Sequence, residues 1–510
     1  MVEHLGNPLT RQGTTMSSQP PSVFSTHIHM KDAYLVEIGS DTGDGSISLR
    51  QWAASNINSA LAGLGRPNLA DERISARVVG SNPAPESFGY KSGLDLAVAV
   101  SALASSGEYD TTALRSTVFV GAVTPDGQVQ DVRGAVPTVE AARSAGFTRC
   151  VLPMSNLSHV SDMEGIEIVG VSTVAEAMTY ASLSTPVPAK QEIKEYPRGI
   201  GSEVDVSELP SSALSVRALM IAAAGGHSAL IYGPPGSGKT MLARRAPTLL
   251  PPPSEEEALE IRKAHSAAGL LSSYRLPAPR RPFRAPHHTI SHAGLHGRVP
   301  RGHLGEIDLA QHGVLFMDEA DQLHFPVFHS LLSRLHTGDS SRWVLLAMSL
   351  DPNQALDADS TGRFRQLSEA VEMRIPVVQA SYSPPSESVA TSAQLRERVV
   401  AARAMAHART RAAFEGMSAV APPNGELALS SFDRISTLSD DVRGVLLAAS
   451  ESGDIANIIA TIRVARTISD LEGSVEIEVA HMKEAISWTL TPQVLRKRDS
   501  RTSAPRGPSL

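Results

Sequence analysis

The stretch SALIYGPPGSGKTMLARRAPTLL, residues 228–250, decides the fold. It begins with a short apolar run typical of a buried strand and ends with a helical pattern. The residues between them, GPPGSGKT at 233–240, fit the pattern G-x-x-x-x-G-K-[ST], and a strand before and a helix after are the context that this loop requires. The chain is therefore expected to contain an α/β core that binds ATP through a phosphate-binding loop.

Each residue type in this loop has a physical reason. Glycines let successive backbone N–H groups converge on phosphate oxygens at the positive end of the following helix. Lys239 is expected to reach the β- and γ-phosphates, and the Thr240 hydroxyl to join the ligands of Mg²⁺. The predicted ATP-binding residues are Gly233, Pro234, Pro235, Gly236, Ser237, Gly238, Lys239 and Thr240.

A second motif, GVLFMDEA at 313–320, places two acids after a buried strand. Burying acids there is costly unless they meet a cation. Asp318 is expected to hold Mg²⁺, and Glu319 to orient and activate the attacking water. The pair Asp-Glu favours hydrolysis of ATP over binding alone.

The whole chain has the composition of an ordinary globular protein. It has 510 residues, of which 42% are hydrophobic and 19% charged, so several domains are expected. It contains no apolar run of about 18 residues and no signal peptide, and its single cysteine excludes an internal disulfide. These features predict a cytoplasmic protein, and the net charge of -7 confines any contact with nucleic acid to a local surface.

Composition and periodicity predict seven segments along the chain. They are a disordered tail (1–25), an α+β domain (26–183), a linker (184–210), the ATPase core (211–380), a hinge (381–394), a helical lid (395–492) and a basic tail (493–510).

A basic island lies between the two ATP motifs. From Arg262 to Gly305 there is no acidic residue, while eight Lys/Arg and six His occur. Such a local reversal of charge suggests contact with phosphates; a solvated loop or a contact between subunits is the alternative. Histidines 288, 292 and 296 have a spacing that suits a metal, but the intervening glycines disfavour a helix there. The predicted DNA-binding residues are Arg281, Arg284, His287, His288, Arg298 and Arg301.

Four segments resemble the ComM/YifB family: RRPFRAPHHT (280–289), GEIDLAQHGVLFMDEA (305–320), AAAGGHSALIYGPPGSGKTMLARR (222–245) and RVARTISDLEG (463–473). These proteins are AAA+ ATPases related to the magnesium-chelatase I subunit. The resemblance implies an AAA+ core with a helical lid, ATP and Mg²⁺ as cofactors, and a homo-oligomeric ring, usually a hexamer. ComM members resemble DNA helicases that drive branch migration.

The family's N-terminal domain is similar to the Lon protease domain, which uses a Ser-Lys dyad. Here the matching positions hold Asp95 and Val136. Without a nucleophile or a base no peptide hydrolysis is expected. The domain is expected to serve assembly or to bind a protein partner.

Several positions depart from the family pattern. Ser349 occupies the place of the asparagine that senses the γ-phosphate, with Asn353 as a shifted candidate, and Ala456 aligns with the second sensor arginine. Arg463 and Arg466 are then expected to serve packing or an interface. Of the family's triple glycine, Gly297 alone remains.

The segment LSEAVEMRIP (367–376) keeps one arginine, Arg374, at the position of the arginine finger that acts on a neighbouring subunit. Such a finger stabilises the charge that develops on the γ-phosphate. We therefore expect Arg374 to join Glu319 as a catalytic residue.

The sequence thus favours a ring-forming ATPase that moves DNA. Two alternatives stay open, namely a chelatase-type motor that remodels a protein partner and a nucleotide-binding scaffold with little turnover. A Lon-like protease is set aside because of Asp95 and Val136.

Overall fold

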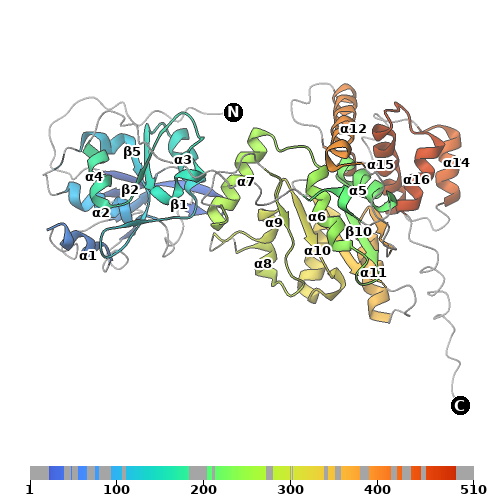
Figure 1. Cartoon of the computed structure of the whole chain (residues 1–510), viewed down its shortest axis with the longest axis horizontal. Coiled ribbons are helices and arrows are strands. Elements are labelled where there is room, and N and C mark those ends of the chain that lie inside the picture. Colours follow the sequence, from blue (N-terminus) through green and yellow to red (C-terminus); the bar gives the residue numbers. More distant parts are fainter. Residues whose placement is uncertain are drawn as a thin grey trace, which may run out of the picture. The chain divides into compact units, whose positions relative to one another are not determined.

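The computed structural model describes residues 22–39, 47–48, 56–65, 75–79, 93–105, 109, 111–182, 204–209, 213–271, 280–298, 300, 302–337, 343–350, 358–378, 390–414, 422–427, 438–449 and 455–489. They form two compact units, Met1–Glu195 with His265–Arg275, and Tyr196–Ala264 with Leu276–Leu510. Each unit is described by itself (Figure 1). Among the described helices, none is long and apolar enough to cross a membrane.

A parallel five-stranded sheet forms the centre of the second unit. Its order is β11-β12-β13-β10-β14, and every neighbouring pair is parallel. The strands are β10 (Ala229–Gly233), β11 (Phe283–Arg284), β12 (Val314–Met317), β13 (Trp343–Ser349) and β14 (Met373–Pro376). The predicted apolar runs are therefore parallel strands.

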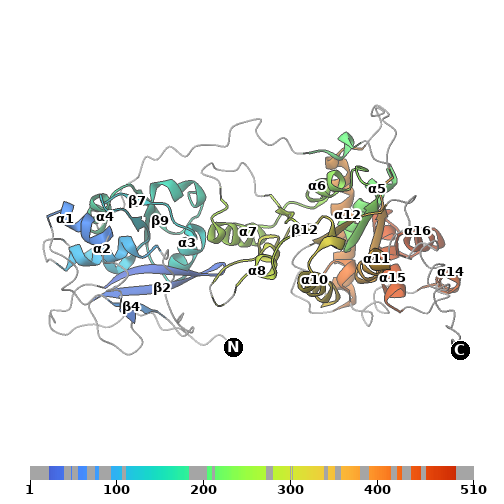
Figure 2. The same cartoon turned by 90° about the horizontal axis from the view of Figure 1, so that it is seen from below.

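Both faces of this sheet are buried, which explains why its strands are apolar without alternation. In β12, Phe316 joins the core formed with α5 and α6, while Leu315 and Met317 join the core formed with α10 and α11. Figures 1 and 2 both show α10 and α11 side by side. The core helices are α5 (Ala213–Gly225), α6 (Lys239–Leu249), α8 (His292–His296), α9 (Glu306–Leu309), α10 (Phe325–Thr337) and α11 (Ala358–Ala370). Helix α7 (Glu255–Ala268) begins in this unit, and its residues from His265 onward belong to the first unit.

A helical region follows the sheet. Its helices are α12 (Ser392–Ala413), α14 (Asp440–Ala449), α15 (Ile455–Leu471) and α16 (Val479–Thr489). Apolar residues of α12 and α15, such as Val399 and Val464, share one core with α5 and α6. Short 3-10 turns lie at Val206–Glu208 (η4), Ala320–Gln322 (η6) and Asn424–Glu426 (η7).

A buried polar network also joins α15 to the sheet. The fully buried ring of His227, which precedes β10, bonds the Glu372 carboxylate at 2.6 Å and the Thr467 hydroxyl at 2.8 Å. Arg463 of α15 donates to the other oxygen of Glu372 at 2.8 Å. Arg466 is fully buried and pairs with Asp470 at 3.0 Å. Arg463 and Arg466 therefore serve internal packing, one of the two roles expected for them.

The first unit contains a mixed seven-stranded sheet of order β3-β4-β2-β1-β5-β8-β9 and a small hairpin, β6–β7. Its first four strands pair antiparallel and its last four parallel. The strands are β1 (Val23–His29), β2 (Asp32–Gly39), β3 (Ile47–Ser48), β4 (Ser75–Val78), β5 (Thr117–Phe119), β6 (Ala122–Val123), β7 (Val129–Gln130), β8 (Arg149–Pro153) and β9 (Glu167–Val171).

Helices cover both faces of this sheet. One core contains α1 (Asn56–Gly63), α2 (Asp95–Ala104) and α4 (Val174–Ser182), which Figure 2 shows close together. On the other face, α3 (Ala135–Ser144) is joined to β1 by a bond of 2.7 Å between Thr26 and Thr138. Two 3-10 turns, η2 (Thr112–Ser116) and η3 (Met154–His159), complete the described elements.

Three residues of this unit bear on the predictions. The carboxylate of Asp95 accepts from the backbone of Val123 at 3.2 Å, and burial raises its pKa. Val136 is fully buried in α3. Cys150 is fully buried in β8, where burial raises the pKa of its thiol to about 12.

Three predicted boundaries differ from the structure by a few residues. The predicted linker, 184–210, ends too late, because Val206 and Leu209 already belong to the core of the second unit. Strand β1 begins at Val23, inside the predicted tail, because its pairing with β2 continues from His29 back to that residue. Helix α12 begins at Ser392, inside the predicted hinge, because Thr391 caps it by accepting from the backbone of Gln394. The predicted basic tail lies outside the described residues.

Candidate functional site

The phosphate-binding loop lies where β10 ends and α6 begins. Gly236 and Gly238 adopt left-handed backbone angles, with φ of 74° and 97°, which glycine reaches without steric cost. Gly233 has a second constraint, because a Cβ there would lie 2.1 Å from the carbonyl oxygen of Val377. The glycines are therefore required by the backbone path of the loop.

The loop has polar groups suited to a ligand. Lys239 donates to the carbonyl oxygens of Gly233 at 3.0 Å and Pro234 at 2.8 Å. Burial lowers its pKa, against the opposing effect of Asp318, Asp321 and Glu319. The hydroxyl of Ser237 is buried and has no hydrogen-bond partner in the described part of the chain. An unpartnered buried hydroxyl beside a lysine fits a loop that binds phosphate.

The two ATP motifs meet at one hydrogen bond. The hydroxyl of Thr240, in the first turn of α6, donates to the carboxylate of Asp318 at 2.6 Å. Asp318 directly follows β12, so the sheet brings together residues that are 78 positions apart. A hydroxyl and a carboxylate are the oxygen donors that Mg²⁺ prefers, and these residues therefore fit the predicted magnesium site.

Glu319 is held in an uncommon conformation. Its backbone is left-handed, with φ 48° and ψ 47°, which costs a residue with a side chain of the order of 1 kcal/mol. Its side chain is 45% exposed, and its carboxylate bonds Nδ1 of His288 at 2.8 Å. His288 was predicted to bind DNA; in this structure its ring contacts Glu319, and a contact with DNA stays a prediction.

Sequence reasoning also missed two neighbours of this site. Arg363 of α11 donates to the carbonyl oxygens of Asp321 and Leu323 at 2.5 and 2.9 Å and lies over the ring of Phe328. Burial and the nearby Glu319 raise the pKa of Asp321, while Arg363 and His288 oppose the shift. Arg363 thereby fixes the turn that follows the acidic pair, and no motif signals it.

Arg374 is not exposed, contrary to what a finger acting on a neighbouring subunit requires. It lies within β14, is 2% exposed, and donates to Oγ of Ser368 at 2.8 Å. Its two terminal nitrogens bond the backbone oxygens of Ser368 and Thr489. This placement contradicts the expectation, because the guanidinium is already bound inside its own subunit.

The positions predicted to hold sensor residues lie in different parts of the structure. Ser349 is exposed at the end of β13, and its register partner in β10 is Gly233, so it lies beside the phosphate-binding loop. Asn353 lies outside the described residues. Ala456 is in the first turn of α15.

Arg281 and Arg284 form internal ion pairs. Arg281 is 10% exposed and pairs with Glu257 at 2.9 Å while donating to the carbonyl oxygens of Pro251 and His312. Arg284 makes two bonds, of 2.6 and 2.7 Å, to the carboxylate of Glu306. Both predicted DNA contacts are therefore corrected. Glu306, the first acid after the island, is the sequence signal that could have identified the partner of Arg284.

The rest of the basic island differs in exposure. Arg298 is exposed, and its backbone pairs with that of His303. His287 is also exposed, and its ring lies against that of His288 with centroids 4.1 Å apart. Arg301 lies outside the described residues.

Contrary to the expected effect of the glycines, a one-turn helix does form over His292–His296. The rings of His292 and His296 stack at 4.4 Å, and His296 bonds the Ser330 hydroxyl of α10 at 2.9 Å. In the described chain, no group of three or more His, Cys, Asp or Glu is arranged to hold a metal ion.

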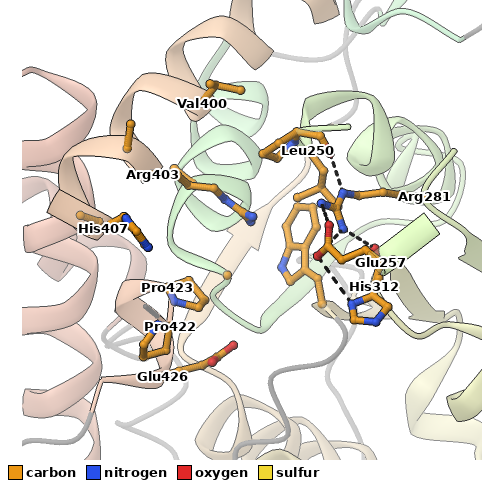
Figure 3. Close-up of a pocket in the computed structure, with 17 residues that line it drawn as sticks. Leu250, Glu257, Arg281, His312, Val400, Arg403, His407, Pro422, Pro423 and Glu426 are labelled. Carbon is orange, nitrogen blue, oxygen red and sulfur yellow. Dashed lines mark hydrogen bonds and ion pairs between the residues drawn. The ribbon is translucent and has the colours of Figure 1, made fainter. Parts of the chain in front are cut away.

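A separate cavity of about 420 Å³ lies at the amino-terminal ends of the strands, opposite the ends that carry the ATP motifs (Figure 3). His312 precedes β12 and Trp343 begins β13, whereas the phosphate-binding loop follows the end of β10. Figure 3 shows Arg281 beside Glu257 and His312 in its wall, facing Arg403 of α12. Arg281 thus belongs to this wall, away from the ATP motifs.

Comparison with known proteins agrees with this geometry. Residues 205–340 match the family described as magnesium chelatase, subunit ChlI, and residues 389–489 match its C-terminal part. Residues 79–156 match the family described as subunit ChlI of Mg-chelatase.

Three curated proteins are similar over most of the chain. An uncharacterised protein of Mycobacterium tuberculosis is 30% identical over 78% of this chain and 83% of its own length. The competence protein ComM of Haemophilus influenzae is 28% identical over 84% of this chain and 88% of its own. The uncharacterised protein YifB of Salmonella typhimurium is 27% identical over 82% and 86%.

These similarities, together with the joined ATP motifs, show that the chain belongs to the ComM/YifB family of magnesium-chelatase-related AAA+ ATPases.

Proposed function

We propose that this member of the ComM/YifB family is a cytoplasmic, ring-forming motor that hydrolyses ATP to move DNA. The bond between Thr240 and Asp318 is the observation that supports turnover best, because it joins the two motifs that must share one magnesium ion. Bound Mg²⁺ would neutralise charge on the β- and γ-phosphates. Lys239 would leave the carbonyl oxygens of Gly233 and Pro234 for those phosphates, and Ser237 would gain a partner.

In the proposed reaction, Glu319 orients the attacking water and takes its proton. The side chain of Glu319 is 45% exposed, which is consistent with access of that water. A finger from a neighbouring subunit would be an arginine other than Arg374. Arg365 of α11 is a candidate, because its side chain is 62% exposed.

Contact with DNA would be made by the exposed part of the basic island, with Arg298 and His287 as its described members and Arg301 as a further candidate. Similarity to a competence protein supports DNA as the substrate. Phosphate contacts of this kind would be independent of base sequence and weakened by salt. A Lon-like N-terminal domain without protease activity would bind a protein partner or assist ring assembly.

A chelatase-type motor acting on a protein is the second candidate. Similarity to magnesium-chelatase subunit ChlI favours it, as does the pairing of Arg281 and Arg284 with acids, which leaves fewer cations for DNA. A nucleotide-binding scaffold with little turnover would explain the altered sensor positions.

The test is steady-state ATP hydrolysis with and without single-stranded or forked DNA. We expect DNA to raise the rate of ATP hydrolysis by the wild-type protein severalfold. Lys239→Ala should abolish hydrolysis altogether. Arg298→Ala should weaken only the increase caused by DNA. Arg396→Ala, which removes another arginine outside the basic island, is the matched control. If the rate of ATP hydrolysis is the same with and without DNA, the DNA motor is rejected in favour of the chelatase-type motor. If the assembled protein does not hydrolyse ATP, the nucleotide-binding scaffold is favoured.

A further inference from the structure

We propose that the cavity at the amino-terminal ends of the strands binds a small organic anion, whose carboxylate or phosphate head pairs with Arg403 and whose apolar body lies against Trp343. The inference goes beyond the proposed function, because no residue of the two ATP motifs lines this cavity. It assigns a second ligand to the unit that contains the parallel sheet.

The cavity has the size and the lining of a small-molecule site. Its volume of about 420 Å³ lies within the range of ligand pockets. Apolar side chains form much of its wall, among them Leu250, Val400 and Trp343. Trp343 is 5% exposed, and its indole nitrogen donates to the carbonyl oxygen of His227 at 2.7 Å, which fixes the ring. Such a wall favours an organic molecule over a bare ion.

Arg403 of α12 supplies the charge for the head of the ligand. Its Nε and Nη2 donate to the carbonyl oxygen of Ala223 in α5 at 3.2 and 2.6 Å, which fixes the plane of the guanidinium. Within the described chain, Nη1 has no acceptor and the side chain forms no ion pair. Figure 3 shows the guanidinium directed toward the cavity. A guanidinium held in this way offers donors in fixed positions to a carboxylate or a phosphate.

The acids in the wall do not neutralise Arg403. Glu257 pairs with Arg281 at 2.9 Å and also lies 3.6 Å from His312. Burial, followed by the like charge of Arg281, lowers the pKa of Arg403 to about 10 from its usual 12.5, although Glu257 and Glu426 oppose the shift. Arg403 therefore keeps its charge at neutral pH. A charge that is partly removed from water is costly without a counter-ion, and an anion in the cavity would supply one.

His407 lies one turn further along α12 and also lines the cavity. In Figure 3 its ring points to the same side of the helix as the guanidinium of Arg403, so an imidazole N–H could reach the same head group. Pro423, which precedes η7, lines the cavity as well. A bound molecule would therefore contact α12, the start of β13 and the segment before η7, and it should stabilise the unit against unfolding.

The experiment is isothermal titration calorimetry of the full-length protein with phenyl phosphate and with phenylacetate at constant ionic strength. Saturating ADP and Mg²⁺ are present throughout, so that the phosphate-binding loop is already occupied. We expect a Kd below about 1 mM for at least one probe, and the preferred probe shows whether the head group is a phosphate or a carboxylate. At roughly ten times its Kd, that probe should raise the melting temperature by about 2 °C.

Three variants locate the site. Arg403→Gln should weaken binding of the preferred probe about tenfold or more, because it removes the charge and keeps a donor for the carbonyl oxygen of Ala223. His407→Ala should weaken binding about threefold. Arg398→Gln is the matched control and should leave the Kd unchanged, because Arg398 is an exposed arginine of α12 that does not line the cavity.

The proposal is overturned if neither probe binds, if uncharged benzyl alcohol binds as tightly as the anions, or if Arg403→Gln binds like wild type. If Arg403→Gln melts far below wild type, His407→Ala decides instead, and an unchanged Kd in that variant overturns the site. These measurements involve neither ATP turnover nor DNA, so failure of the proposed function would leave their result intact.

Discussion

Arg374 shows at the scale of one residue how position in the fold overrides a motif. The sequence retains an arginine where the family has its finger, but in β14, the last strand of the sheet, the side chain is only 2% exposed. The guanidinium then satisfies the backbone oxygens of Ser368 and Thr489, which link α11 and α16 to β14. Its role in this structure is to join elements of its own subunit.

We expect Arg374→Ala to lower the free energy of unfolding by about 3 kcal/mol, because buried carbonyl oxygens lose their donor and a cavity remains. Urea denaturation would measure this loss. ATP turnover per folded molecule should stay within a few-fold of wild type. Unchanged stability combined with a fall in kcat of about a thousandfold would instead identify a finger.

Gly233 allows a second prediction for a single residue. An added methyl group would meet the carbonyl oxygen of Val377 at 2.1 Å, and that atom belongs to backbone that cannot rotate away. Gly233→Ala should therefore displace the start of the phosphate-binding loop and weaken ATP affinity at least tenfold. Fluorescent-nucleotide titration would measure the affinity. Gly362→Ala is the control, since a Cβ at that glycine of α11 has nothing within 4 Å.

At the scale of elements, helix α15 is tied to the sheet by Glu372. Its two oxygens bond His227, before β10, and Arg463, within α15. Any movement of α15 relative to the sheet would have to break these bonds or carry Glu372 along. The sequence does not indicate the network, because its members are about 90 to 240 positions apart and share no motif.

Glu372→Gln should lower the free energy of unfolding by about 2 kcal/mol, because Arg463 loses its charged partner in a largely buried setting. The rate of backbone amide hydrogen exchange should increase more in α15 than in β10. The control is Glu472→Gln at the more exposed pair with Arg217, which should cost less than about 1 kcal/mol. Equal losses of unfolding free energy in the two variants would contradict the prediction that the Glu372 network stabilises the fold more than the exposed pair does.

The elements also show what sequence reasoning can reach. Local patterns predicted β10, α6 and β12, because an apolar run or a glycine loop is enough to specify each of them. They also predicted the partners Thr240 and Asp318. In the basic island, the charge pattern did not predict which arginines are paired. A count of cations does not reveal that Glu257 pairs with Arg281 and Glu306 with Arg284.

At the scale of the whole molecule, stability should fall in mild acid. Burial, assisted by His29, lowers the pKa of His27 to about 4 from its usual 6.5. The unfolded chain binds this proton at higher pH than the folded chain does. The stabilising contribution is therefore fully present above pH 6.5 and is lost as the pH falls toward 4.

The titration of His27 alone should lower the free energy of unfolding by about 2 kcal/mol between pH 7 and pH 5. Urea denaturation of wild type and His27→Leu at both values measures it, since the difference between the proteins cancels other titrating groups. The variant should lose less stability than wild type over this interval. Equal losses in both would contradict the assignment to His27.

The thiol of Cys150 has a practical consequence for following motion in this protein. It is the only cysteine in the sequence, and in β8 it is fully buried with a pKa near 12, so the folded chain should react slowly with maleimides. A cysteine introduced at exposed Arg298 or Leu447 would then be the main site of dye attachment without prior removal of the native one. Fluorescence from such probes would report separately on the basic island and on α14 when ATP is added.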